Sequence, residues 1–193
     1  GFAGNLTGVS SALAIYTRNG VLLAVDDINA GGGINGRKIE LIVKDDRLDP
    51  ETALKVDQEL IREHVVAIVG HLHGEMCQAV LPLATREKMV LISPGAASNR
   101  FTGIDDYLFR INSPASGTTL ATAKYAYSRG LRNVAVLYDL GNKIYTGSKL
   151  TDFSKAFGAM GGRTTSQSFT SGQDVSFPDL VRDLARSRPD GYF

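Results

Sequence analysis

The sequence predicts an α/β protein made of two similar lobes, each a doubly wound parallel sheet. Short apolar runs alternate with amphipathic segments along most of the 193 residues, as strands alternate with helices in such folds. Most runs are continuously apolar, which is typical of parallel strands covered on both faces. The pattern restarts after Gly117. We therefore expect a first lobe over residues 1–112, a crossover or hinge over 113–117, and part of a second lobe over 118–193.

The first lobe begins with the end of a strand at residues 1–4, followed by a polar loop over 5–11. A helix is expected to about Asn29, because apolar residues repeat at helical spacing on one face: Val21, Ala24, Val25 and Ile28. The glycine-rich segment 30–36 ends this helix, and the next strand is expected over 39–43.

A second helix is expected to begin at Asp49 and Pro50, which are typical of a helix N-cap and first turn. Apolar runs over 65–69 and 89–92 then predict two buried strands with a helix between them. Each strand ends in a loop of small and polar residues, 71–75 and 93–98. The carboxyl ends of parallel strands share one sheet edge, where ligands bind in open α/β sheets, so these loops are the predicted site.

The rest of the chain continues the alternation. A short strand at 109–111 leads into the segment 112–117, which has the composition of a linker. We then expect helices over 118–129 and 147–159 and from about Phe177, where apolar residues again follow helical spacing. The expected strands are 134–138, 163–169 and the beginning of one at 189–193. Because the chain opens and closes within strands, we expect both ends to be incomplete.

Composition excludes several classes of function. The net charge is +1, from 21 basic and 20 acidic residues, and no basic cluster favours nucleic acid or an anionic membrane surface. No apolar run approaches the roughly 18 residues of a membrane span, so no direct membrane insertion is expected. Cys77 is the single cysteine, which excludes an intramolecular disulfide.

Catalytic and cofactor motifs are also missing from the sequence. Gly31-Gly32-Gly33 follows a helix instead of linking a strand to a helix, so it does not match a dinucleotide fingerprint. No Walker motif or Gly-x-Ser-x-Gly elbow occurs. We expect the acidic pairs 26–27, 45–46 and 105–106 to face solvent or cap turns. The prediction is therefore a protein without cofactor or catalytic residues.

His71, His73, Glu75 and Cys77 are residue types that bind metals. However, His71 and His73 alternate in an extended loop and should point apart. We therefore expect no metal ion here: one histidine forms a hydrogen bond within the loop, and Cys77 is a small core residue. A metal site is the alternative.

A set of short motifs runs in order along the whole chain. They are Asp26-Asp27-Ile28-Asn29-Ala30-Gly31-Gly32-Gly33-Ile34-Asn35-Gly36, Lys44-Asp45-Asp46, Asp49-Pro50, Gly70-His71, Ile92-Ser93-Pro94-Gly95-Ala96, Phe109-Arg110, Tyr138-Asp139, Tyr145-Thr146-Gly147, Thr170-Ser171-Gly172 and Asp174-Val175-Ser176-Phe177. In these motifs the chain resembles the periplasmic solute-binding proteins of branched-chain amino-acid ABC transporters. The resemblance implies the type I periplasmic-binding-protein fold, with the second lobe only partly present here.

The resemblance also implies a function. Such proteins are exported to the periplasm, close their two lobes on a small solute, and deliver it to a membrane permease. We therefore expect an extracytoplasmic, non-enzymatic binding protein for an amino acid, amide or related organic acid. The same fold also serves as the sensory domain of membrane receptors, which is the alternative function, and an enzyme on a Rossmann-like fold is a further one.

The residues implied to bind the solute lie in the two loops, the hinge and the second lobe. They are His73, Gly74, Glu75, Gly95, Ala96, Ala97, Ser98, Ser116 and Tyr145. Amino-acid binders of the family commonly carry hydroxyl residues at the positions of Gly74 and Ala97, and an acid near Ala115 or Ser116. All three groups are absent here, so the preferred solute is expected to differ from a plain aliphatic amino acid.

Overall fold

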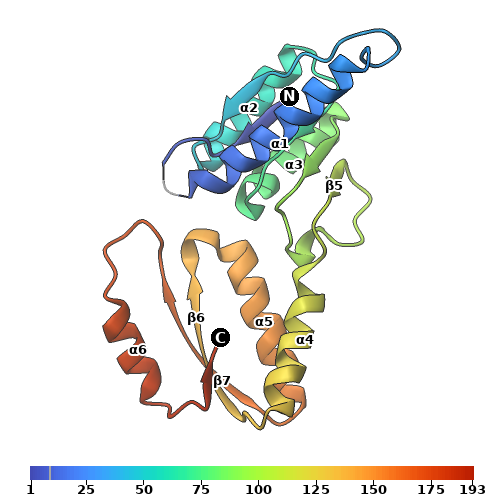
Figure 1. Cartoon of the computed structure of the whole chain (residues 1–193). Helices are drawn as coiled ribbons and strands as arrows, with labels where there is room; N and C mark the ends of the chain where they lie inside the picture. Colours follow the sequence, from blue (N-terminus) through green and yellow to red (C-terminus); the bar gives the residue numbers. More distant parts are fainter. Residues whose placement is uncertain (9) are drawn as a thin grey trace. The chain divides into compact units, whose positions relative to one another are not determined.

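The computed structural model describes residues 1–8 and 10–193 (Figure 1). Val9, which falls in the predicted loop 5–11, lies outside the described residues. The contacts within the chain divide it into two compact units. Unit 1 contains Gly1–Ala96 and Gly103–Asn112, and unit 2 contains Ala97–Thr102 and Ser113–Phe193.

Unit 1 is built on a five-stranded sheet in which every neighbouring pair is parallel. The spatial order is β2-β1-β3-β4-β5. The strands are short: β1 Phe2–Gly4, β2 Val43–Asp45, β3 Ile68–Val69, β4 Leu91–Ser93 and β5 Leu108–Arg110. The parallel α/β architecture predicted from the continuous apolar runs is confirmed.

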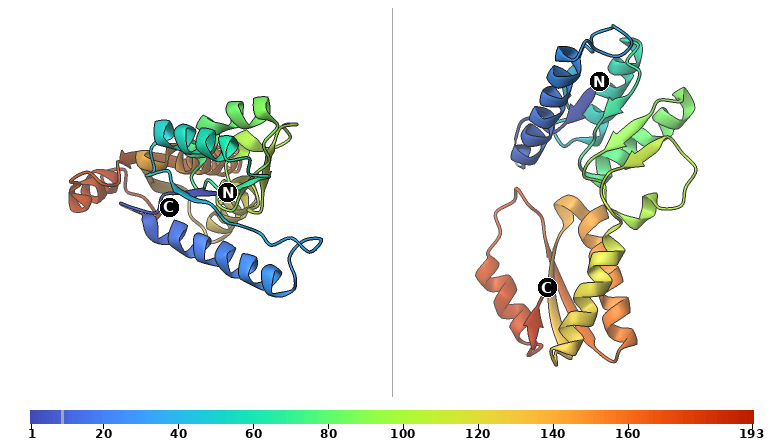
Figure 2. Two further views of the ribbon diagram at one scale, coloured as in Figure 1. Left: turned by 90° about the horizontal axis from the view of Figure 1, so that it is seen from above. Right: turned by 45° about the vertical axis from the view of Figure 1, so that its right-hand side comes forward.

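Three helices cover this sheet. Helix α1 (Ser11–Ala30) lies on one face, while α2 (Pro50–Arg62) and α3 (Gly74–Glu87) pack side by side on the other (Figure 2). The core lies beneath α2 and α3 and contains Ala3, Ala53, Val56, Leu60, Ile68, Met76, Val80, Ala84 and Leu91. A short 3-10 helix, η1 (Asn99–Phe101), follows β4.

The predicted core face of α1 is wrong in part. Val21 and Val25 are half-buried, but Ala24 and Ile28 are exposed. Ala14 is the buried residue of the helix, and it lies close to Gly4 of β1. Helix α1 therefore contacts the sheet through its first turns, and the described residues do not cover the rest of its apolar side.

The strand predicted over 39–43 begins only at Val43. The side-chain amide of Asn29 occupies both backbone groups of Ile39, accepting from its N–H at 2.7 Å and donating to its carbonyl at 2.9 Å. These groups are then satisfied without a β ladder, so regular pairing with β1 starts later, at Phe2↔Val43.

The strand predicted over 65–69 is also shorter, because β3 contains only Ile68 and Val69. The backbone N–H of Val65 still bonds the carbonyl of Leu60 at the end of α2. Val66 is 95% exposed, although it belongs to the apolar run. The first residues of that run are therefore a connection and not a buried strand.

Unit 2 has a three-stranded parallel sheet in the order β7-β6-β8. Its strands are β6 Asn133–Asp139, β7 Arg163–Phe169 and β8 Gly191–Tyr192. Helices α4 (Ala115–Ser128) and α5 (Lys143–Ala159) pack together on one face, and α6 (Phe177–Ala185) lies on the other (Figure 1). The hydrophobic core of unit 2 contains Ala123, Val134, Val136, Phe153 and Phe157.

Two helices of unit 2 begin earlier than predicted. Helix α4 starts at Ala115, inside the segment predicted to be a linker, directly after Pro114. Helix α5 starts at Lys143, after the 3-10 turn η2 (Leu140–Asn142), so Tyr145 and Thr146 are helical. Within the described residues, no helix combines the length and apolar character needed to span a membrane.

Candidate functional site

The two predicted loops lie at the carboxyl edge of the unit 1 sheet. The first loop (residues 71–75) leads from β3 and Gly70 into α3: His73 is the N-cap residue, without a side-chain capping bond, and Gly74 is the first residue of the helix. The second loop (residues 93–98) follows β4 and leads into η1. The direction of winding reverses between β1 and β3, so the first loop adjoins the topological switch point, where such sheets bind ligands.

The loops approach the surrounding backbone so closely that two positions require glycine. A Cβ atom at Gly70 would lie 2.0 Å from the carbonyl oxygen of Ala3, and the φ of Gly70 is +141°. A Cβ atom at Gly95 would lie 2.5 Å from the carbonyl oxygen of Leu72. Gly95 therefore lets the second loop pack directly on the backbone of the first.

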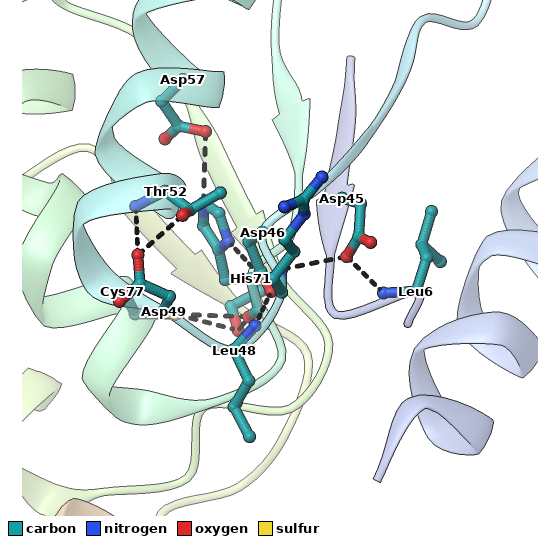
Figure 3. Close-up of polar contacts among 11 residues, drawn as sticks. Leu6, Asp45, Asp46, Leu48, Asp49, Thr52, Asp57, His71 and Cys77 are labelled. Atoms are coloured by element: carbon teal, nitrogen blue, oxygen red, sulfur yellow. Dashed lines mark hydrogen bonds and ion pairs between the residues drawn. The ribbon is translucent and has the colours of Figure 1, made fainter. Parts of the chain in front are cut away.

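His71 is fully buried and its side chain lies between two carboxylates (Figure 3). Its Nδ1 is 2.6 Å from Oδ2 of Asp46, which follows β2, and its Nε2 is 3.2 Å from Oδ1 of Asp57 on α2. Both aspartates are also buried. Asp46 additionally accepts the backbone N–H of Leu48, which closes a turn.

This arrangement changes the protonation of His71. Burial alone lowers the pKa of an imidazole, but the hydrogen bonds and charges of Asp46 and Asp57 outweigh burial and raise the pKa of His71 to about 9. The geometry is compatible with this state, since a protonated imidazole has an N–H for each of the two carboxylates, whereas a neutral imidazole has only one.

The main chain of His71 links the two loops. Its carbonyl oxygen accepts hydrogen bonds from Oγ of Ser93 and, at 3.2 Å, from Sγ of Cys77. Oγ of Ser93 in turn accepts the backbone N–H of Ala96 at 3.0 Å. Burial raises the pKa of the Cys77 thiol to about 11, so this side chain is a neutral donor in the core.

The prediction that Cys77 is a small core residue is confirmed. One histidine of the first loop is hydrogen-bonded as expected, but the partners of the His71 side chain, Asp46 and Asp57, lie outside the loop. The expectation that the pair Asp45-Asp46 faces solvent or caps a turn is confirmed, because Asp45 accepts the backbone N–H of Arg47 and Asp46 accepts that of Leu48. The burial of Asp46 against His71 was not predicted. Within residues 1–8 and 10–193, no three His, Cys, Asp or Glu side chains are arranged to hold a metal ion.

Some buried polar atoms near this edge of the sheet have no hydrogen-bond partner among the described residues. Nε2 of His73 is buried without a hydrogen-bond partner among the described residues, and burial lowers the pKa of His73. Asn5 follows β1, is 1% exposed, and leaves both its amide oxygen and nitrogen unpaired within the same described set. Gly74 is buried at the beginning of α3, and Glu75 beside it is half-buried.

The second loop passes from unit 1 to unit 2 between Ala96 and Ala97. Ala97 is buried and its carbonyl oxygen accepts the backbone N–H of Ala115 at 2.8 Å. Oγ of Ser98 lies 3.0 Å from Oγ of Ser148 on α5. The backbone N–H of Ser116 points to Oδ1 of Asn99 at 3.4 Å, so these predicted residues are neighbours.

A cavity of about 530 Å³ lies beside these residues in unit 2. It is lined by η1 and α5 through Asn99, Arg100, Lys143, Ile144, Gly147, Ser148, Thr151 and Asp152. Tyr145 is half-buried in the first turn of α5, with Nζ of Lys149 5.1 Å from the centre of its ring. The predicted site residues therefore form one group in unit 1 and another in unit 2.

The sequence interpretation missed several residues of these groups. Asp57 did carry a signal: it is an acid on the apolar face of α2 among Ala53, Val56 and Leu60, and a buried acid needs a partner. Asn5 and the cavity residues of α5 had no comparable signal, because loop and helix-start residues of these types usually face solvent.

Comparisons with known proteins point to one family. The family model described as periplasmic binding protein matches residues 1–193. A leucine-, isoleucine-, valine-, threonine- and alanine-binding protein of Pseudomonas aeruginosa is 31% identical over 100 residues, or 52% of this chain and 27% of that protein. The chain thus covers much less than two thirds of this relative.

Solved structures show the same fold. The branched-chain amino acid transporter substrate-binding protein of Streptococcus pneumoniae, in complex with isoleucine, is 27% identical with a TM-score of 0.83, over 94% of this chain and 52% of that one. An ABC transporter solute-binding protein of Rhodopseudomonas palustris, in complex with 3,4-dihydroxybenzoic acid, is 25% identical with a TM-score of 0.87. That match covers 100% of this chain and 52% of the other.

Proposed function

This chain belongs to the periplasmic binding protein family of the branched-chain amino-acid type, and we propose that it captures a small polar solute for an ABC importer. The carrying observation is the meeting of the two loops at the carboxyl edge of the unit 1 sheet. There Gly74 begins α3, Gly95 packs against the backbone of Leu72 in the first loop, and the N–H of Ala96 bonds Oγ of Ser93.

The chemistry of this edge suits a group that accepts hydrogen bonds. The N–H groups in the first turn of an α-helix have no partner within the helix, and the helix dipole favours a negative charge there. Small residues at positions 74 and 95–97 let a ligand approach the backbone. A carboxylate or amide oxygen is therefore the expected anchor at the start of α3.

The rest of the solute is proposed to be more polar than an aliphatic side chain. The missing hydroxyls at Gly74 and Ala97 weaken the recognition of an α-amino acid, each by about 1 to 3 kcal/mol if the bond is not replaced. His73 and Asn5 offer unpaired polar atoms close to the first loop. An amino acid, an amide or a related organic acid, including an aromatic acid, is the proposed ligand class.

Capture is proposed to occur by closure about residues 113–117, with Ser98, Ser116 and Tyr145 of unit 2 completing the site. A membrane permease would then recognise the closed form, as hinge closure around a ligand is a common switch. We propose accordingly that the protein works in the periplasm or another extracytoplasmic compartment. Relatives are binding proteins, and we propose that this chain likewise has no catalytic activity.

A thermal-shift screen of the complete gene product tests the proposal. The panel contains isoleucine and other amino acids, amides, polyamines and aromatic acids such as 3,4-dihydroxybenzoate. A compound that binds only the folded state at 100 times its Kd adds about 2.7 kcal/mol of stability and raises the unfolding midpoint. We expect a clear rise with at least one amino acid, amide or organic acid. Conversion of any panel compound to a product would contradict the assignment.

A further inference from the structure

We propose that Asp46, His71 and Asp57 form a positioning cluster that sets the conformation of both ligand loops without touching the solute. The inference rests on the proposed function, because it treats these loops as the binding site. Figure 3 shows the three side chains converging from the turn after β2, the first loop and α2.

The side chain of His71 fixes the beginning of the first loop. Two buried carboxylates hold its ring at both nitrogens, at 2.6 and 3.2 Å, so the ring cannot rotate or flip without breaking a charge-assisted bond. Asp46 is itself held by the N–H of Leu48, and Asp57 lies in the second turn of α2. The anchor is therefore attached to two elements outside the loop.

The main chain of His71 passes this constraint to the second loop. Its carbonyl oxygen accepts a hydrogen bond from the hydroxyl of Ser93. The oxygen of that hydroxyl in turn accepts a hydrogen bond from the backbone N–H of Ala96. Because Gly95 packs on the carbonyl of Leu72, a shift of His71 would displace both loops together. The order of contacts runs from Asp57 and Asp46 through His71 and Ser93 to Ala96.

The charges around the cluster favour a protonated ring. Apart from the two aspartates, the titratable groups near the ring are the thiol of Cys77 and His73, whose charged form Asp46 favours. Burial raises the pKa of the thiol and lowers the pKa of His73. Of these side chains, His71 is the one in hydrogen-bond contact with both aspartates.

The experiment combines nuclear magnetic resonance of the complete protein labelled with ¹⁵N-histidine with amide hydrogen exchange, and requires no ligand. We expect both ring nitrogens of His71 to be protonated at pH 7.5 and to titrate well above those of His73. In Asp57→Asn we expect the titration of His71 to fall. The amides of 71–76 and 93–96 should then exchange at least tenfold faster, while Ile68 and Leu91 keep their protection.

Asp45→Asn is the matched control, because Asp45 adjoins Asp46 but bonds Leu6, Thr7 and Arg47 instead of His71. It should leave the His71 titration and the loop exchange unchanged. A neutral His71 at pH 7.5, unchanged loop exchange in Asp57→Asn, or equal loss of protection in loops and strands would each overturn the proposal. Asp46→Asn is the second variant if Asp57→Asn does not fold. Failure of the solute screen would leave these results intact.

Discussion

At the scale of single residues, the protonation of His71 gives the fold a pH dependence of known sign. Its pKa is about 9 in the folded state and about 6.5 when the chain is unfolded. A raised folded-state pKa means that the stabilisation is fully present below pH 6.5 and is lost as the pH rises through 9. The pKa of Cys77 is also raised, but ionisation of that thiol affects the free energy of unfolding mainly above pH 9.

We therefore predict that the free energy of unfolding falls by about 3 kcal/mol between pH 6.5 and 9.5 through His71. Urea unfolding at a series of pH values measures it, with the difference between wild type and His71→Gln as the readout. Contributions of groups other than His71 are present in both proteins and are removed to a first approximation by taking the difference. A difference that stays flat over this range would show that His71 is not charged in the fold.

The place of the expected site residues in the fold was predictable. Gly74 and Gly95, which the family resemblance implies as ligand-binding residues, both lie in loops at the carboxyl edge of the unit 1 sheet, and their role in binding stays a prediction. The partners of His71 were not identified, since Asp46 and Asp57 are 25 and 14 residues away from it along the chain. Only the tertiary fold brings such charges together.

At the scale of elements, the boundaries depend on side-chain bonds that periodicity does not contain. The strand predicted over 39–43 starts at Val43 because Asn29 satisfies Ile39 from the end of α1. Helix α4 starts at Ala115, although Ser116 and Gly117 suggest a linker, because Ala97 accepts the N–H of Ala115. The type and order of the elements followed from hydrophobic pattern, and their ends did not.

The hydrogen bonds between the Asn29 side chain and the backbone of Ile39 predict a loss of stability when Asn29 is replaced. Asn29→Ala removes one donor and one acceptor for Ile39, so we expect the free energy of unfolding to fall by about 1 to 3 kcal/mol. Gly20→Ala is the control in the same helix, because a Cβ atom there meets no neighbour. It should raise the stability by up to about 1 kcal/mol through helix propensity. Equal effects of both substitutions in denaturant unfolding would refute the role of Asn29.

At the scale of the whole molecule, the two-lobed parallel α/β fold was predictable from the strand–helix alternation and its restart after Gly117. The fold is confirmed by both parallel sheets and by the solved relatives. The extent of each lobe follows long-range contacts instead: residues 97–102 belong to unit 2, although they precede β5 of unit 1. The hinge at 113–117 stays a prediction.

The central claim is that the two loops at the sheet edge bind the solute, and calorimetric titration of Gly74→Leu tests it most directly. The titrant is the panel compound that raises the unfolding midpoint of the complete protein most. Gly20→Leu is the matched control, at an exposed helical glycine with open space around it. Ala97→Leu provides a second test of the same edge.

We predict that Gly74→Leu and Ala97→Leu lose at least a hundredfold in affinity, because a leucine side chain at either buried position would interfere with the approach of a solute to the backbone of these loops. Their unliganded forms should still unfold cooperatively, and Gly20→Leu should bind like wild type. Unchanged affinity in folded Gly74→Leu and Ala97→Leu would contradict the account, because the solute would then bind elsewhere.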